Sequence, residues 1–132
     1  MSHQFTIRFP VRFRDVDVLG HVNNAVYFTY METARTEFWL QVFGGESLND
    51  LNFIVVHAEC DFKLPAHFGD EIEVGIRTSS IGNTSFVWDY EIRNAKSDEL
   101  FAAGKTIQVF YNHSTRKSSP VPPEVREKLI SW

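Results

Sequence analysis

The sequence of 132 residues contains one cysteine, Cys60, and no large excess of charge of either sign. A single cysteine excludes an internal disulfide and suits a reducing compartment. The formal net charge of −4 gives no general electrostatic footprint for nucleic acid, so we expect no nucleic-acid partner. No apolar run is long enough for a secretory segment or a membrane span. We therefore expect a cytoplasmic protein with no membrane partner.

Aromatic residues, in contrast, are abundant. The chain has twelve phenylalanines, and hydrophobic residues make up 43% of it. This composition is typical of a globular protein that can fill a core or line an apolar pocket. The length predicts one domain over residues 1–132.

Alternating apolar and polar residues predict five strands, at 5–13, 53–64, 71–77, 86–93 and 100–111. Pro10 cannot donate to a sheet, so part of the first strand should lie at an edge or a bulge. Short polar turns join the last four strands and predict an antiparallel meander. Residues 120–132 begin with prolines and continue as a short amphipathic helix, which we expect to pack as a flap.

A long helix is predicted over 25–43, because this segment has no proline or glycine and is followed by Gly44 and Gly45. Asn23 or Asn24 can cap its start. Most of its circumference is apolar, which predicts that other structure wraps around it. One stripe carries residues at helical spacing: Tyr27, Tyr30, Met31, Ala34 and Phe38.

These elements predict an α+β domain in which one antiparallel sheet covers one central helix. The strands are long, and the last one is apolar on both faces. A monomer would leave sheet surface or an edge exposed, so we expect a homo-oligomer.

The loop before the long helix concentrates polar residues, namely Asp15, Asp17, His21, Asn23 and Asn24. A carboxylate beside the first turn of a helix combines a base or nucleophile with backbone N–H donors that lack helical partners. These are the two parts that acyl transfer requires. We therefore expect the functional site in this loop.

Other chemistry has less support. Asp15, Asp17 and His21 could ligate a divalent ion, but no familiar metal-ligand spacing accompanies them, and we expect no metal. No GxSxG motif occurs, and Cys60 falls among the apolar residues of its strand, so we expect it in the core. His57 is either solvent-exposed or a pocket residue, and Tyr27 is either a core aromatic or a substrate contact.

The segment FRDVDVLGHVNNAVYFTYMETAR resembles the signature of the hotdog-fold acyl-CoA thioesterases, specifically the 4-hydroxybenzoyl-CoA thioesterase-like family. A second segment, FIVVHAECDFKLPAHFGDEIEV, is similar to the same family. The resemblance implies the hotdog fold, in which a five-stranded antiparallel sheet wraps a long helix. It also implies a homodimer with a continuous sheet, or a homotetramer. The substrate would be an acyl-CoA, with no further cofactor, because coenzyme A is part of the substrate.

The resemblance also implies roles for residues. Asp17 would be the catalytic residue, acting as general base or nucleophile, and backbone N–H groups around Val22 to Asn24 would bind the carbonyl oxygen. The implied substrate-binding residues are His21, Val22, Asn23, Tyr27 and His57. Asp15 would be structural.

Asn24 stands where the benzoyl-specific branches carry tyrosine or histidine. It can orient water or the carbonyl but cannot act as an acid. This argues against an aromatic acyl group and favours broad acyl-CoA thioesterases, including those of fatty acid metabolism. The alternatives are a non-catalytic hotdog module that binds an acyl ligand or a partner, and a hotdog dehydratase. The dehydratase is disfavoured because its Asp-Asn-Pro and downstream histidine arrangement is missing.

Overall fold

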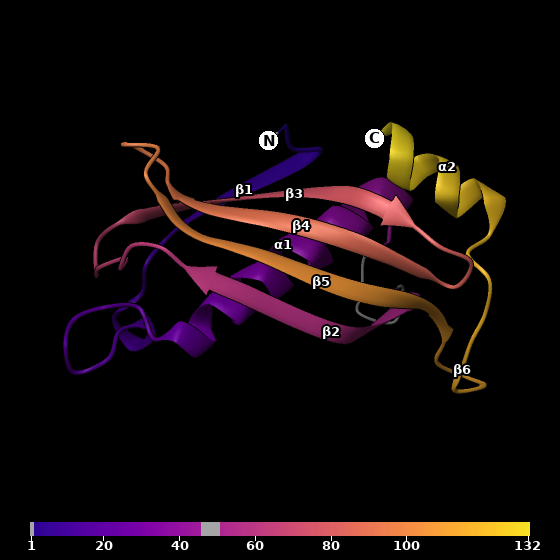
Figure 1. Ribbon diagram of the computed structural model, residues 1–132, viewed down its shortest axis with the longest axis horizontal. Helices are drawn as coiled ribbons and strands as arrows, with labels where there is room; N and C mark the ends of the chain where they lie inside the picture. The colour runs from indigo at the N-terminus through magenta and orange to yellow at the C-terminus, as the bar shows by residue number, and fades with distance from the viewer. Residues whose placement is uncertain (1, 46–50) are drawn as a thin grey trace.

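A computed structural model describes residues 2–45 and 51–132 and has the predicted hotdog architecture, with a long helix packed on one face of an antiparallel sheet (Figure 1). The strands lie in the order β1-β3-β4-β5-β2, and the short β6 pairs with β5. Part of the predicted linker, 46–50, falls outside the described residues. The elements in chain order are β1 (Phe5–Pro10), a 3-10 turn (Phe13–Asp15), α1 (Asn24–Phe43), β2 (Phe53–Phe62), β3 (Glu71–Ile81), β4 (Ser85–Asn94), β5 (Leu100–Asn112), β6 (Lys117–Ser118) and α2 (Pro123–Ser131).

The long helix α1 begins and ends as predicted. The side chain of Asn23 caps it by accepting a hydrogen bond of 2.9 Å from the Ala25 N–H. Gly44 ends it in the left-handed conformation, at φ +73°, and donates its N–H to the carbonyl of Leu40. All five residues of the predicted stripe are buried. The opposite side of the helix is exposed at Thr29, among others, because the sheet covers one face of the helix.

The core consists mainly of aromatic rings between α1 and the sheet. Trp39 of α1 stacks against Phe86 of β4 at a ring separation of 5.9 Å, and Phe38 meets Trp88 edge-on at 6.0 Å. Such ring pairs stabilise a core beyond the area that they bury. The core therefore anchors α1 firmly along its length. The predicted C-terminal helix also packs inward and buries Val125 and Leu129.

The first strand is shorter than predicted. It ends at Pro10, which has no N–H for a sheet partner. The chain then enters a 3-10 turn, in which the Arg12 N–H donates to Asp15 Oδ2 at 2.9 Å. As a result Phe13 is exposed instead of continuing the buried face of the strand. This early turn places the following residues beside the start of α1.

The second strand, β2, also ends early, at Phe62, and lies at the edge of the sheet. A register shift between Val55 and His57 interrupts its alternation. Cys60 is only half-buried, which corrects the prediction of a core cysteine. Because no strand of the described chain covers the free edge of β2, the apolar side chains of Val56 and Phe62 are exposed.

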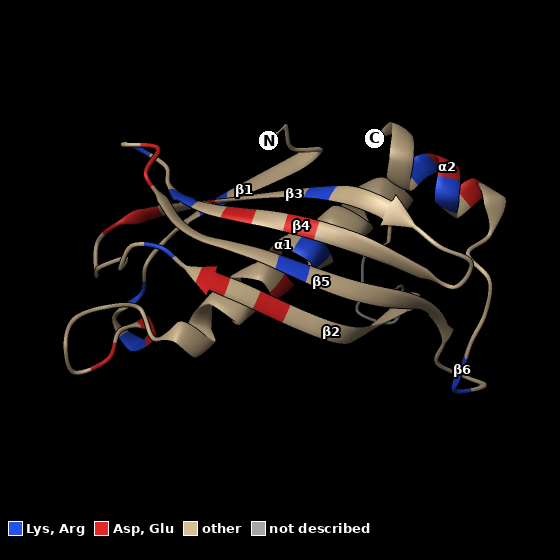
Figure 2. Ribbon diagram, viewed as in Figure 1, with Lys and Arg blue, Asp and Glu red and all other residues tan. Residues whose placement is uncertain are grey.

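The outer face of the sheet carries charges of alternating sign (Figure 2). One row crosses four strands through directly paired positions, in the order Arg77, Asp89, Lys105 and Glu59. Opposite charges at paired positions stabilise neighbouring strands in contact with water. Within the described ranges, no helix has both the length and the apolar character required to cross a bilayer.

Candidate active site

Asp17 lies in a narrow hairpin at the end of the molecule where α1 begins. Val16 and Val22 form an antiparallel bridge, and the Asp17 N–H donates to the carbonyl of His21 at 2.8 Å. The turn closes through a 3.0 Å bond from the Gly20 N–H to the carbonyl of Asp17. Gly20 has φ +80°, a conformation that other residues adopt at a cost. The position of Asp17 is thus fixed by local backbone bonds.

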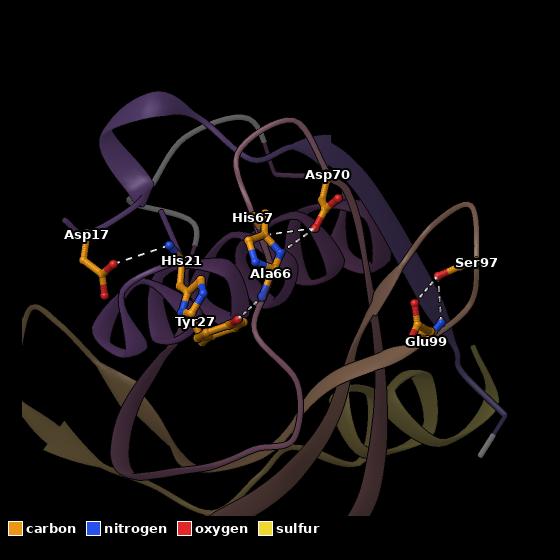
Figure 3. Close-up of polar contacts among 8 residues, drawn as sticks. All are labelled: Asp17, His21, Tyr27, Ala66, His67, Asp70, Ser97 and Glu99. Carbon is orange, nitrogen blue, oxygen red and sulfur yellow. Dashed lines mark hydrogen bonds and ion pairs between the residues drawn. The ribbon is translucent and has the colours of Figure 1, made fainter. Parts of the chain in front are cut away.

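The carboxylate of Asp17 is held on one oxygen. Its Oδ1 accepts a hydrogen bond from the N–H of Leu19 at 2.9 Å. It accepts a second from the N–H of His21 at 3.4 Å (Figure 3). Its Oδ2 has no hydrogen-bond partner among residues 2–45 and 51–132. One carboxylate oxygen is therefore oriented, while the other remains open to accept a proton.

A segment after β2 supports this hairpin from behind. The Val22 N–H donates to the carbonyl of Ala66 at 2.8 Å, and the Ala66 N–H donates to the hydroxyl of Tyr27 at 3.3 Å. The rings of His21 and His67 meet edge-on, 4.9 Å apart, between the hairpin and the segment (Figure 3). Burial raises the pKa of Tyr27, so its hydroxyl keeps its proton. Sequence reasoning missed this supporting role, since these hydrogen bonds link residues 39 and 44 positions apart in the sequence.

The first turn of α1 offers one open backbone donor. Of the amides predicted to bind a carbonyl oxygen, that of Val22 is used by Ala66, and that of Asn23 donates to the carbonyl of Asp15 at 2.9 Å. The N–H of Asn24, the first residue of the helix, has no partner within the described part of the chain. The predicted group of donors is therefore reduced to Asn24, at the positive end of a helix of 20 residues.

Asp17 and Asn24 line the same hollow, which has a volume of about 220 Å³. The predicted residues His21, Val22 and Tyr27 line it too, and Phe62, Lys63, Leu64 and Pro65 close the other side. The structure thus brings together five of the seven predicted site residues. The other two do not line this hollow within one chain. Asn23 instead caps α1, and exposed His57 pairs with Glu59 at 3.0 Å, so their roles in binding stay predictions.

A second hollow, of about 560 Å³, borders Asp17 on its other side. Its walls are mostly apolar and include Val16, Val18, Phe13 and Phe68. The rings of Phe13 and Phe68 meet edge-on, with their centroids 5.9 Å apart. Asp17 lines both hollows. The apolar pair Val18-Leu19, which interrupts a polar loop, was the signal for this surface, and both side chains are exposed at the tip of the hairpin.

No group of three or more histidine, cysteine, aspartate or glutamate side chains in the described ranges could hold a metal ion. The carboxylate of Asp15 has a structural role, because its Oδ2 accepts hydrogen bonds from the Tyr30 hydroxyl and the Arg12 N–H. The chemistry that this site offers is therefore that of a carboxylate beside a backbone donor.

An antiparallel sheet packed on one long helix is the architecture of the hotdog fold. The chain belongs to the thioesterase-like superfamily, whose family model matches residues 11–129. It is 37% identical over 126 residues to a 1,4-dihydroxy-2-naphthoyl-CoA hydrolase of Synechocystis, a match that covers 89% of this chain and 88% of that protein.

Solved structures agree in fold. A thioesterase of Thermus thermophilus, crystallised with coenzyme A and zinc, superposes with a TM-score of 0.88 at 34% identity, covering 97% of this chain and 98% of that one. A gentisyl-coenzyme A thioesterase superposes with a TM-score of 0.83 at 25% identity, covering 95% of this chain and 99% of that one. The protein is accordingly an enzyme of the thioester hydrolase class.

Proposed function

We propose that this protein hydrolyses an acyl-CoA thioester to the free acid and coenzyme A, with Asp17 as the catalytic residue. The observation that carries the proposal is that the open oxygen of Asp17 and the open N–H of Asn24 belong to residues lining one hollow. A base and an oxyanion donor on the same cavity are the minimum that hydrolysis of a thioester needs.

In the first form of the mechanism, Asp17 Oδ2 takes a proton from a water molecule as the water oxygen attacks the thioester carbonyl carbon. The Asn24 N–H stabilises the negative charge that develops on the carbonyl oxygen. The intermediate then collapses, the carbon–sulfur bond breaks, and the proton on Asp17 passes to the leaving thiolate. In the second form, an oxygen of Asp17 attacks the carbonyl carbon, the carbon–sulfur bond breaks, and coenzyme A leaves as the thiolate. Water then cleaves the resulting mixed anhydride, which releases the acid and restores the Asp17 carboxylate.

The surroundings of Asp17 suggest where the two arms of the substrate lie. The apolar hollow beside Phe13 and Phe68 suits the acyl group, because burying apolar area there is favourable. The hollow lined by His21, Tyr27 and Lys63 offers polar contacts to the thioester and to the pantetheine arm. The amide side chain of Asn24 is available to orient the attacking water.

The acyl group that this chain prefers can be compared with the acyl groups that its relatives' names state. Two of the relatives named above, the 1,4-dihydroxy-2-naphthoyl-CoA hydrolase and the gentisyl-coenzyme A thioesterase, act on aromatic thioesters by their names, whereas Asn24 argues for a non-aromatic acyl group. We propose a broad preference that includes aliphatic chains. A homodimer formed along the edge of β2 would cover the exposed side chains of Val56 and Phe62 and could bring the partner's β2 close to the site.

The proposal is tested by measuring thiol release from acetyl-, hexanoyl-, palmitoyl- and benzoyl-CoA. Replacing Asp17 by Asn or Ala should lower kcat by about 100-fold or more, because it removes the base or nucleophile. Asp61→Asn, at an exposed position of β2, is the matched control and should keep wild-type rates. Undiminished turnover in both Asp17 variants would contradict the mechanism.

A non-catalytic acyl-binding module is the second candidate, and the exposed apolar surface of Phe13, Val18 and Phe68 would suit such a role. It predicts saturable binding of acyl-CoA without thiol release for every chain length tested. Calorimetric titration beside the activity assay separates the two functions.

A further inference from the structure

A third cavity, of about 450 Å³, lies away from the Asp17 hollows, along the seam between β1 and α1. Asp17 and Asn24 are not among its lining residues. From α1 its wall includes Val26 at one end and Glu37 at the other. Eleven residues of helix separate them, which corresponds to a groove of about 16 Å at the usual helical rise. A groove of this length suits an extended ligand.

Two unpaired cations mark one end of the groove. Arg12, directly before the 3-10 turn, and Arg14, within that turn, line the groove. Neither guanidinium has a carboxylate within ion-pairing distance among the described residues. The third arginine of the wall, Arg8, is already neutralised by Glu73 at 2.7 Å. An arginine guanidinium favours a carboxylate or a similar planar anion.

Asp15, in the wall beside them, offsets one of these two positive charges, so this end of the groove keeps a net positive charge. Asp15 Oδ2 is occupied by two hydrogen bonds, from the Tyr30 hydroxyl at 2.8 Å and the Arg12 N–H at 2.9 Å. Burial, together with the bond to Asp15, raises the pKa of Tyr30, so the phenol stays neutral. Glu37 stands near the far end of the groove, about three helical turns beyond Val26. The groove is thus cationic at one end and acidic at the other.

Between the two ends, the groove is largely apolar. Ile7 and Phe9 of β1 face Val26 and the ring of Tyr30 on α1, and the rings of Phe9 and Tyr30 lie 4.8 Å apart. This surface would bury an aliphatic chain favourably. Thr29 and Thr33 line the side nearer to solvent.

We propose that this groove binds an amphiphilic monoanion, an aliphatic carboxylic acid, with its carboxylate between Arg12 and Arg14 and its chain along the seam of β1 and α1. Glu37 disfavours a ligand with a second negative end, which excludes dicarboxylic acids. The site is separate from the proposed catalytic hollow, and its occupation does not depend on the chemistry of Asp17.

The test is a calorimetric titration of the full chain with decanoate, held below its micelle concentration, and with decanol as the uncharged probe. We expect saturable binding of decanoate and much weaker binding of decanol. The double variant Arg12→Gln/Arg14→Gln should bind decanoate about tenfold more weakly or worse, because charge-assisted bonds are lost. The matched control is Arg116→Gln/Lys117→Gln, in the exposed turn after β5, and it should bind as the wild type does.

A second variant, Thr29→Trp, fills the groove from its exposed side and should abolish decanoate binding without disturbing the core. The proposal is overturned if decanoate does not bind saturably, if decanol binds equally well, or if both groove variants bind as the wild type does. It is also overturned if Asp17→Asn, and not the groove variants, removes binding, because the acid would then occupy the catalytic hollow as a product. Thiol release by the same preparations reports separately on the proposed hydrolysis.

Discussion

The hydroxyl of Tyr30 donates a 2.8 Å hydrogen bond to Oδ2 of Asp15, and this bond ties the buried stripe of α1 to the loop that carries Asp17. The same oxygen accepts the Arg12 N–H, while the carbonyl of Asp15 accepts the Asn23 N–H. Asp15 therefore connects the 3-10 turn, the hairpin and the helix cap. This is the structural role that the sequence predicted for the first aspartate of the pair.

Removing the Tyr30 hydroxyl should loosen this connection. We expect Tyr30→Phe to lower the free energy of unfolding by about 1.5–3 kcal/mol, as for a hydrogen bond to a charged group. It should also lower kcat for thioester hydrolysis more than it changes KM, because Asp17 becomes less well positioned. Chemical denaturation and steady-state kinetics measure the two effects. Tyr111→Phe, in β5, is the matched control, and equal losses in both variants would contradict this role.

Much of the fold was predictable because its periodic patterns are strong. The run Phe86, Trp88, Tyr90 and Ile92 alternates cleanly, and all four side chains are buried. The ends of the strands were predicted less well. Nothing in local alternation reveals that the carboxylate of Asp15 turns the chain back after Pro10, or that β2 is an edge strand whose apolar side chains stay exposed.

The site was predictable where its residues are neighbours in sequence. Asp17 and Asn24 stand seven positions apart and line one hollow, as a loop leading into a helix suggests. The contribution of Ala66 was not predictable, because its bonds to Val22 and Tyr27 depend on how the chain returns after β2. The bond from the Val22 N–H to Ala66, together with that from the Asn23 N–H to Asp15, also explains why the open donor is Asn24 and not the whole predicted group.

Cys60 should react slowly with alkylating reagents. Burial, assisted by the negative charge of Asp61, raises the pKa of its thiol from 9.0 to about 11. At pH 8 this leaves about 100-fold less thiolate than in the unfolded chain, and thiolate is the reactive form. Iodoacetamide labelling followed by mass spectrometry should show slow modification in buffer and rapid modification in urea. Cys60→Ser should retain hydrolysis, whereas a large loss of turnover would indicate a role that the structure does not assign.

His3 should make stability depend on pH. Its ring packs so closely on Gly75 that a side chain there would overlap it, and burial lowers its pKa below 6.5, although Glu91 acts in the opposite direction. The unfolded chain therefore binds a proton near pH 6.5 while the folded chain does not. This contribution to stability is present above pH 6.5 and is lost as the pH falls below it.

We therefore expect the free energy of unfolding of the wild type to decrease between pH 7.5 and pH 5.5 more steeply than that of His3→Gln. Urea denaturation at several pH values measures both slopes. Identical slopes would show that His3 binds a proton equally well in the folded and the unfolded state, which would contradict the prediction.

The apolar hollow next to Asp17 should determine acyl preference. Phe68→Ala removes one ring of its wall. We expect kcat/KM for palmitoyl- and benzoyl-CoA to fall about tenfold or more, because burial of the acyl group is lost, while acetyl-CoA is barely affected. Leu64→Ala, on the wall of the other hollow, is the comparison. A uniform loss for all substrates in Phe68→Ala would place the acyl group elsewhere.

The backbone N–H of Asn24 can be removed while the helix is retained. Asn24 is the first residue of α1, where proline is favoured, because an N–H at that position has no helical partner. Asn23 has φ −59° and ψ +134°, a conformation that the residue before a proline readily adopts. Asn24→Pro should therefore fold normally, with an unchanged circular dichroism spectrum.

Its activity should nevertheless fall sharply. Loss of one oxyanion donor typically lowers kcat by about 100- to 1000-fold, and we expect a decrease of that size in Asn24→Pro. Asn24→Ala keeps the N–H and removes only the amide side chain. Its decrease in kcat, which we expect to be smaller, would measure how much that side chain contributes by orienting water. If Asn24→Pro hydrolyses acyl-CoA as fast as Asn24→Ala does, the carbonyl oxygen is bound by another group, and the backbone donor has no part in the reaction.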